Sequence, residues 1–110
     1  MDVKRLKPEE IYGKVVEAGE TWADCDAAAS ILEETRKTVL AELMNQSQAS
    51  SMAAKESAAL ADPVYRLHVT NMVNARKDAN RAKVRFDGAK LLAELRRSEE
   101  SSRRAELRGA

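Results

Sequence analysis

The sequence predicts an all-α fold, and three observations lead to that prediction. Alanine supplies much of the 44% apolar content, and alanine is the best helix former. Proline occurs only as Pro8 and Pro63, and the β-branched and aromatic runs typical of strands are absent. With one Trp, two Tyr and one Phe, the core must come from closely packed helices of small residues. We expect a single domain over residues 1–110, a long antiparallel helical hairpin that assembles into an oligomeric helical bundle or coiled coil.

The first helix is expected at about residues 8–45. Pro8, followed by two glutamates, favours a helix start, because proline fits the first turn and acidic groups favour the positive end of the helix dipole. Apolar residues then recur at alternating spacings of four and three, which predicts one buried stripe on a continuous helix. That stripe comprises Ile11, Val15, Ala18, Trp22, Cys25, Ala29 and Leu32, and it resumes after Arg36 with Val39 and Leu43.

The middle segment, residues 46–61, is expected to be a linker or a broken helix. Its serines and glutamines are typical of a linker, whereas its alanines and Leu60 also allow a helix. Asp62 as a capping residue and Pro63 at the first helical position then predict a second helix at about residues 63–104. A frayed tail is expected at residues 105–110.

The second helix carries two separate apolar arcs at about 100° per residue. One arc is rich in alanine and suits close packing against the first helix, whereas the other holds larger aliphatic side chains. One partner helix cannot cover both arcs, so we expect an obligate homo-oligomer, with a dimer as the favoured state. The residues expected at the core and oligomer seams are Trp22, Leu32, Met72, Ala79, Phe86, Val84, Leu91 and Leu95.

Nothing in the sequence is typical of an enzyme, and we expect no catalytic residues, cofactor or metal. His68 and Cys25 each lie on an apolar stripe, where a core role is the ordinary one. The carboxylates lack the accompanying histidine spacing of a bundle metal site, and the four glycines are too scattered for a phosphate loop. A single cysteine and no apolar run of about 20 residues predict a cytoplasmic protein without a membrane segment.

Charge is distributed unevenly along the chain. Residues 1–62 hold seven Lys/Arg against twelve Asp/Glu, a net charge of −5, and residues 63–110 hold twelve against six, a net charge of +6. Two explanations remain open: the halves pair with each other, or the basic half also meets an anionic partner. The candidate binding residues for DNA or a protein partner are Arg76, Lys77, Arg81, Lys83 and Arg85.

Two segments of the chain carry a resemblance to known proteins. The first is "TWADCDAAASILEETRKTVLAELM", with Trp22 and Leu32 to Thr35. The second runs from Tyr65 to Leu107, with "ARKDANRAKVRFDGAK" and "RRSEESSRRAEL". Together they resemble small helical proteins of bacteriophages and prophages, a group without an assigned function. Members of the group are encoded near single-strand annealing recombination genes, so the resemblance implies an accessory in DNA recombination or replication in a bacterial host cell.

The resemblance implies DNA or a phage or host DNA-processing protein as the partner, and it transfers no functional residue. The alternative is a purely protein-binding adaptor, or an inhibitor of a host factor, whose basic residues are structural.

Overall fold

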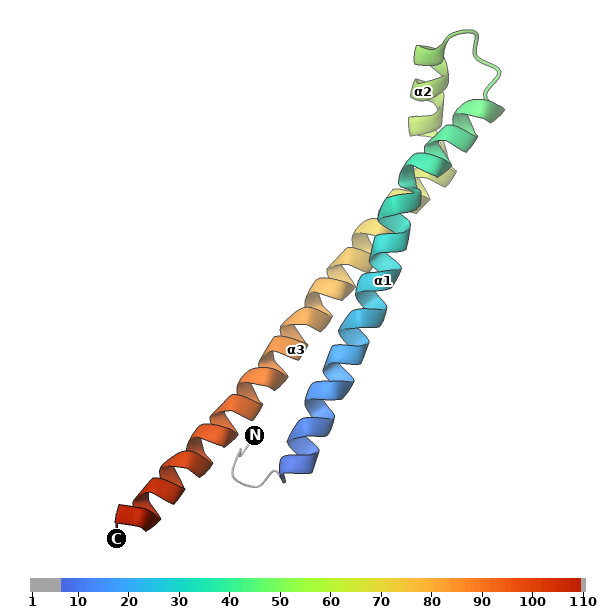
Figure 1. Ribbon diagram of the computed structural model, residues 1–110. Coiled ribbons are helices and arrows are strands. Elements are labelled where there is room, and N and C mark those ends of the chain that lie inside the picture. The colour runs from blue at the N-terminus through green and yellow to red at the C-terminus, as the bar shows by residue number, and fades with distance from the viewer. Residues whose placement is uncertain (1–6, 110) are drawn as a thin grey trace. The chain divides into compact units, whose positions relative to one another are not determined.

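A computed structural model describes residues 7–109, and this part of the chain consists of three helices and short connections without a strand. The helices are α1 (Pro8–Gln46), α2 (Met52–Ala61) and α3 (Pro63–Gly109) (Figure 1). The predicted all-α class is therefore confirmed for the described residues.

Helix α1 begins as its sequence predicts, with Glu9 and Glu10 in the first turn. The Glu10 carboxylate also accepts a hydrogen bond from the backbone N–H of Lys7, at 3.3 Å. The helix continues without interruption across Gly13 and Gly19, because the apolar stripe on either side keeps one phase.

The segment predicted as linker or broken helix contains both: residues 47–51 form the connection and α2 follows. Ser51 caps α2, since its backbone is extended and its Oγ accepts a hydrogen bond from the N–H of Ala54 at 3.1 Å. Asp62 ends α2 with an extended backbone, which is the conformation that Pro63 favours for the residue before it. Its Oδ1 then accepts a hydrogen bond from the N–H of Val64 at 2.8 Å and so caps α3.

Helix α3 continues to Gly109, five residues beyond the predicted end near 104. Residues 101–109 are mostly good helix formers, and the Arg104 guanidinium lies 4.0 Å from the Glu100 carboxylate, one helical turn away. The frayed tail expected at 105–110 is thus helical as far as Gly109, and Ala110 lies outside the described residues.

The chain divides into two compact units. Unit 1 contains the described residues up to Ala23 and those from Arg81 onward, and unit 2 is Asp24–Asn80. Each unit holds one section of α1 and one section of α3, and α2 belongs to unit 2. Long paired helices make contacts only along their own length, so successive sections have separate cores.

In unit 1 the packing combines buried small residues with one aromatic pair. Ile11 and Ala82 are buried, and the rings of Trp22 and Phe86 stack with their centroids 5.8 Å apart. Gly19 makes room for this pair, because a Cβ built there would lie 3.0 Å from Phe86 Cε1. A glycine on α1 therefore lets the Phe86 ring lie directly against the helix backbone.

In unit 2 the sections of α1 and α3 pair in antiparallel order. The Tyr65 hydroxyl accepts a hydrogen bond from Arg36 Nη1 at 3.1 Å. His68 Nε2 lies 2.8 Å from the carbonyl oxygen of Leu32, so this nitrogen carries the donated proton. Tyr65 pairs with Arg36, and the later residue His68 pairs with the earlier residue Leu32, which is the antiparallel order. The buried residues of this unit are Ala29, Ala59, Tyr65 and Ala79.

Candidate functional site

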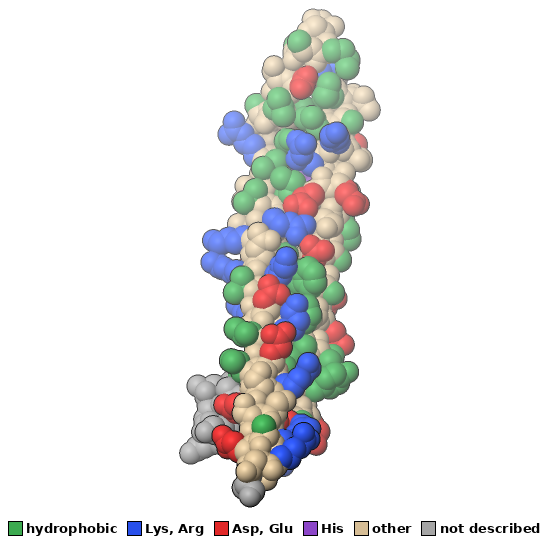
Figure 2. Space-filling model, turned by 60° about the vertical axis from the view of Figure 1, so that its left-hand side comes forward, with side chains coloured by type: hydrophobic (Ala, Val, Ile, Leu, Met, Phe, Trp, Pro, Cys, Tyr) green, Lys and Arg blue, Asp and Glu red, His purple; other side chains and the backbone are tan. Residues whose placement is uncertain are grey.

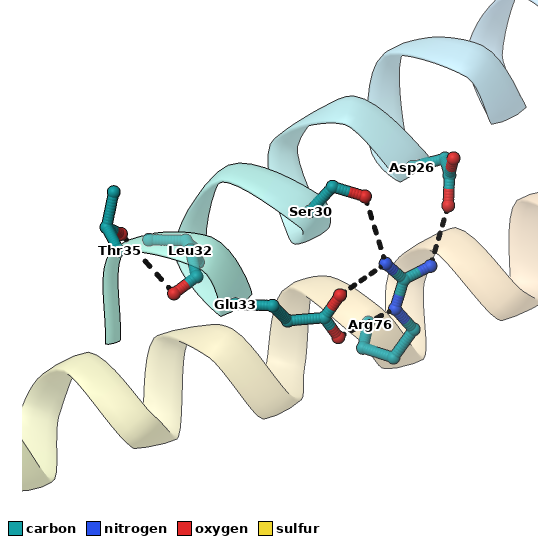
Figure 3. A network of polar contacts seen from close by, with 6 residues as sticks. All are labelled: Asp26, Ser30, Leu32, Glu33, Thr35 and Arg76. Carbon is teal, nitrogen blue, oxygen red and sulfur yellow. Dashed lines mark hydrogen bonds and ion pairs between the residues drawn. The ribbon is translucent and has the colours of Figure 1, made fainter. Parts of the chain in front are cut away.

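Among the predicted binding residues, Arg76 forms the densest set of contacts, and all of them lie within unit 2 (Figure 3). Its Nε and Nη2 donate to the two carboxylate oxygens of Glu33, at 3.0 and 2.7 Å. Its Nη1 donates to Asp26 Oδ1 at 2.7 Å, and Nη2 also reaches Ser30 Oγ at 3.4 Å. A guanidinium held by a two-point bond and a second carboxylate is a strong cross-helix contact.

Electrostatics in this network favour the charged forms of Glu33 and Arg76. Hydrogen bonding to Arg76 lowers the pKa of the Glu33 carboxyl, and this effect outweighs desolvation. Glu33, followed by Asp26, raises the pKa of Arg76 above its already high value. The Arg76 guanidinium is thus paired with two carboxylates of α1.

Lys83 is placed beside the aromatic pair of unit 1. Its Nζ lies 6.0 Å from the centre of the Trp22 ring, at the outer limit of a cation–π contact. Lys90, which the sequence did not single out, lies closer to an aromatic ring, 4.5 Å from the centre of Phe86, and its Nζ is 3.3 Å from Asp87 Oδ1. Both lysines therefore contribute to local packing.

The remaining predicted residues are exposed cations. Arg81 and Arg85 lie in unit 1, one helical turn apart on α3, and Lys77 lies in unit 2. None of the three forms an ion pair with any residue between 7 and 109. Figure 2 shows that basic and acidic side chains alternate with hydrophobic ones on the face it displays. The cations without an ion pair over this range therefore form small groups on the surface and not one continuous positive face.

A groove of about 270 Å³ lies next to Arg85 in unit 1. Its α1 wall consists of Lys14, Glu17, Ala18 and Thr21, and its α3 wall consists of Ala82 and Arg85. Lys14 was not predicted as a binding residue, because it belongs to the acidic half of the sequence. Only the register between the two helices brings it to the same groove as Arg85.

A second, larger groove of unit 1 has a volume of about 420 Å³ and a mainly apolar lining that includes Ile11, Tyr12 and Val15. Arg96 borders it at a position where the α3 stripe would carry an apolar residue. The Arg96 side chain is 15% exposed, and the carboxylates of Glu99 and Glu100 lie 4.0 and 3.5 Å from its nitrogens. Its charge is thus balanced by carboxylates of the same helix.

The predicted seam residues fall into two groups. Ala79 is buried, and the larger members at the α1–α3 contacts are partly buried: Trp22, Leu32, Met72 and Phe86. The second arc faces solvent, with Val84 71% exposed, Leu91 56% and Leu95 50%. The α1 sections therefore cover the alanine-rich arc of α3 and leave the aliphatic arc uncovered.

Two further properties bear on the type of site. Within residues 7–109 no group of three or more His, Cys, Asp or Glu side chains is arranged to hold a metal ion. Over the same range no helix is long and apolar enough to cross a membrane.

The chain was compared with protein families, curated proteins and solved structures. No protein-family model matches the chain, and no curated protein or solved structure is significantly similar to it.

Proposed function

We propose that this chain is a non-enzymatic, oligomeric helical protein that binds DNA through exposed basic side chains of α3. The observation that supports the proposal is the state of Arg81 and Arg85. Both are exposed, lie one turn apart, and form no ion pair within residues 7–109. Two cations about 6 Å apart along a helix can contact successive phosphates of one nucleic-acid strand.

The proposed setting is DNA recombination or replication in the cytoplasm of a phage-infected or prophage-carrying bacterium. It rests on the resemblance of residues 21–44 and 65–107 to small phage proteins. In that setting the protein acts as an accessory, holding DNA, a DNA-processing protein of the phage or host, or both.

We further propose that the α1 and α3 sections form one long antiparallel hairpin and that two hairpins associate. Support comes from the uncovered aliphatic arc, since large exposed apolar residues on one helix face commonly mark an interaction surface. Light scattering is expected to give at least twice the chain mass of 12.2 kDa. A monomer at all concentrations would refute the association. Changing Leu91 and Leu95 to Ser is expected to shift the population toward monomer.

The DNA proposal is tested by fluorescence anisotropy with labelled single- and double-stranded oligonucleotides at several salt concentrations. Arg81→Glu/Arg85→Glu is expected to weaken binding and to lower the log–log salt slope on duplex by about 1.8, since each phosphate contact contributes about 0.9. The matched control is Lys37→Glu/Arg66→Glu, which makes the same charge change at two exposed positions of unit 2.

Equal losses in both double variants would show that net charge alone governs binding and would refute the assignment to Arg81 and Arg85. Absence of salt-dependent binding by the parent protein to either type of DNA would refute the function itself. Circular dichroism of each variant establishes that the helices remain folded.

A second candidate function is a protein-binding adaptor or inhibitor without nucleic-acid contact. The exposed Val84, Leu91 and Leu95 favour it, because an apolar stripe suits a partner helix. Its signature is a protein partner whose binding persists at high salt and is lost on changing Leu91 to Ser, with no effect of Arg81→Glu/Arg85→Glu.

A further inference from the structure

We infer that Lys14 of α1 and Arg85 of α3 form a two-sided clamp for a backbone phosphate of nucleic acid. The inference rests on the proposed DNA binding and adds α1 to the binding surface. Both side chains line the 270 Å³ groove of unit 1 from opposite helices. Two cations that face one groove repel each other, and an anion between them offsets that repulsion.

The described residues of unit 1 place no carboxylate against either cation. Within residues 7–109 neither Lys14 nor Arg85 has a carboxylate within 4.0 Å. Glu17 also lines the groove, yet it makes no ion pair with either cation over the same range. This arrangement contrasts with Arg76 in unit 2, where two α1 carboxylates meet the guanidinium directly.

The shape of the groove suits a phosphate at the surface. Ala18 and Ala82 are its small members, and Ala82 is buried, whereas Lys14 and Arg85 contribute the long cationic side chains of the two walls. The Thr21 hydroxyl donates its proton to the carbonyl of Glu17 at 3.0 Å, so it supplies no donor to the anion. The donors are therefore the Lys14 ammonium and the planar Arg85 guanidinium, which binds phosphate at two points.

A nucleic-acid strand fits this site better than a free phosphate ion. The groove is open to solvent, where a single exposed ion pair contributes little. A strand instead brings several phosphates, and Arg81, one turn before Arg85, is positioned to contact the next one. Charge neutralisation at several points is how nucleic-acid binding gains its affinity.

The test uses the full chain, labelled oligonucleotides and three single variants: Lys14→Ala, Glu17→Gln and the matched control Glu34→Gln. Lys14→Ala is expected to lower the salt slope by about 0.9 on duplex or about 0.7 on a single strand. Glu17→Gln is expected to tighten binding several-fold at low salt, because it removes a negative charge from the groove, whereas Glu34→Gln on the unit 2 part of α1 leaves affinity unchanged. A purely structural role of Lys14 would not move the salt slope.

The outcomes separate the clamp from the proposed function. If the parent binds DNA, Arg81→Glu/Arg85→Glu weakens it, and Lys14→Ala and Glu17→Gln have no effect, then the clamp is wrong and the function stands. If the parent does not bind DNA, both fail. A further competitor is poly-glutamate, which is compared with unlabelled DNA for displacement of the labelled oligonucleotide. Equal displacement by the two, weakened equally by Lys14→Ala, would overturn the assignment of the site to nucleic acid. Inorganic phosphate is expected to compete only at far higher concentration.

Discussion

Two glycines of α1 provide a matched test of the packing in unit 1. Gly13 has nothing within 4 Å of an added Cβ, whereas a Cβ on Gly19 would lie 3.0 Å from Phe86 Cε1 and 3.3 Å from Cζ. Alanine in a helix interior is about 1 kcal/mol more favourable than glycine. Gly13→Ala is therefore expected to stabilise the protein by about 1 kcal/mol, which raises the melting temperature by about 4–8 °C.

Gly19→Ala receives the same helix-propensity gain but must displace the Phe86 ring. That ring is stacked on Trp22, so moving it disturbs the aromatic pair, and overpacking of this kind costs about 1–3 kcal/mol. The expected net effect ranges from about zero to about 2 kcal/mol of destabilisation. Thermal unfolding at one protein concentration measures both variants, and near-UV circular dichroism of Trp22 reports the ring shift. Equal stabilisation by the two substitutions would show that Phe86 does not lie against Gly19.

Three further predictions concern other parts of the chain. Because the pKa of Glu33 is lowered in the fold, its contribution to stability is complete above its ordinary pKa of 4.5 and is lost as the pH falls through the lowered value. Melting temperature against pH should therefore fall less steeply on the acid side for Glu33→Gln, and Glu34→Gln should retain the parent profile. Ser51→Ala removes the acceptor for the N–H of Ala54 and is expected to cost about 1 kcal/mol in urea unfolding; no change would mean that α2 contributes nothing to the cooperative unit. Gly88 lies four residues after Val84 and three before Leu91, on the exposed aliphatic arc proposed for association. Gly88→Ala adds a methyl group there, where nothing lies within 4 Å, and should weaken self-association measured by sedimentation; unchanged association would place the dimer contact elsewhere.

Periodic features of the fold could be predicted from the sequence. Alternating spacings of three and four identified the α3 face that includes the buried Ala79 and Ala82 and the partly buried Phe86, because burial on a helix repeats with the turn. The start of α2 could not be predicted. Serines occur at 47, 50 and 51, and local sequence does not distinguish which of them caps a helix.

The candidate site was less predictable because it depends on contacts distant in sequence. Arg76 looks like any other exposed cation of α3 until the register places Asp26 and Glu33, 50 and 43 residues away, beside it. Lys14 is the converse case, a cation in an acidic segment that the same register brings to the groove of Arg85. Spacing within one helix contains no information about either pairing.

Few ion pairs join the acidic and basic halves of the chain among residues 7–109. Over residues 7–109, Arg76 is the cation of α3 that forms ion pairs with α1 carboxylates. The other ion pairs lie within α3, where Asp87, Glu99 and Glu100 serve Lys90, Arg96 and Arg104. The described part of the acidic half therefore neutralises little of the +6 charge by direct contact. We propose an external anion as the partner of the exposed arginines, and a steep salt dependence of binding is the property that follows from this proposal.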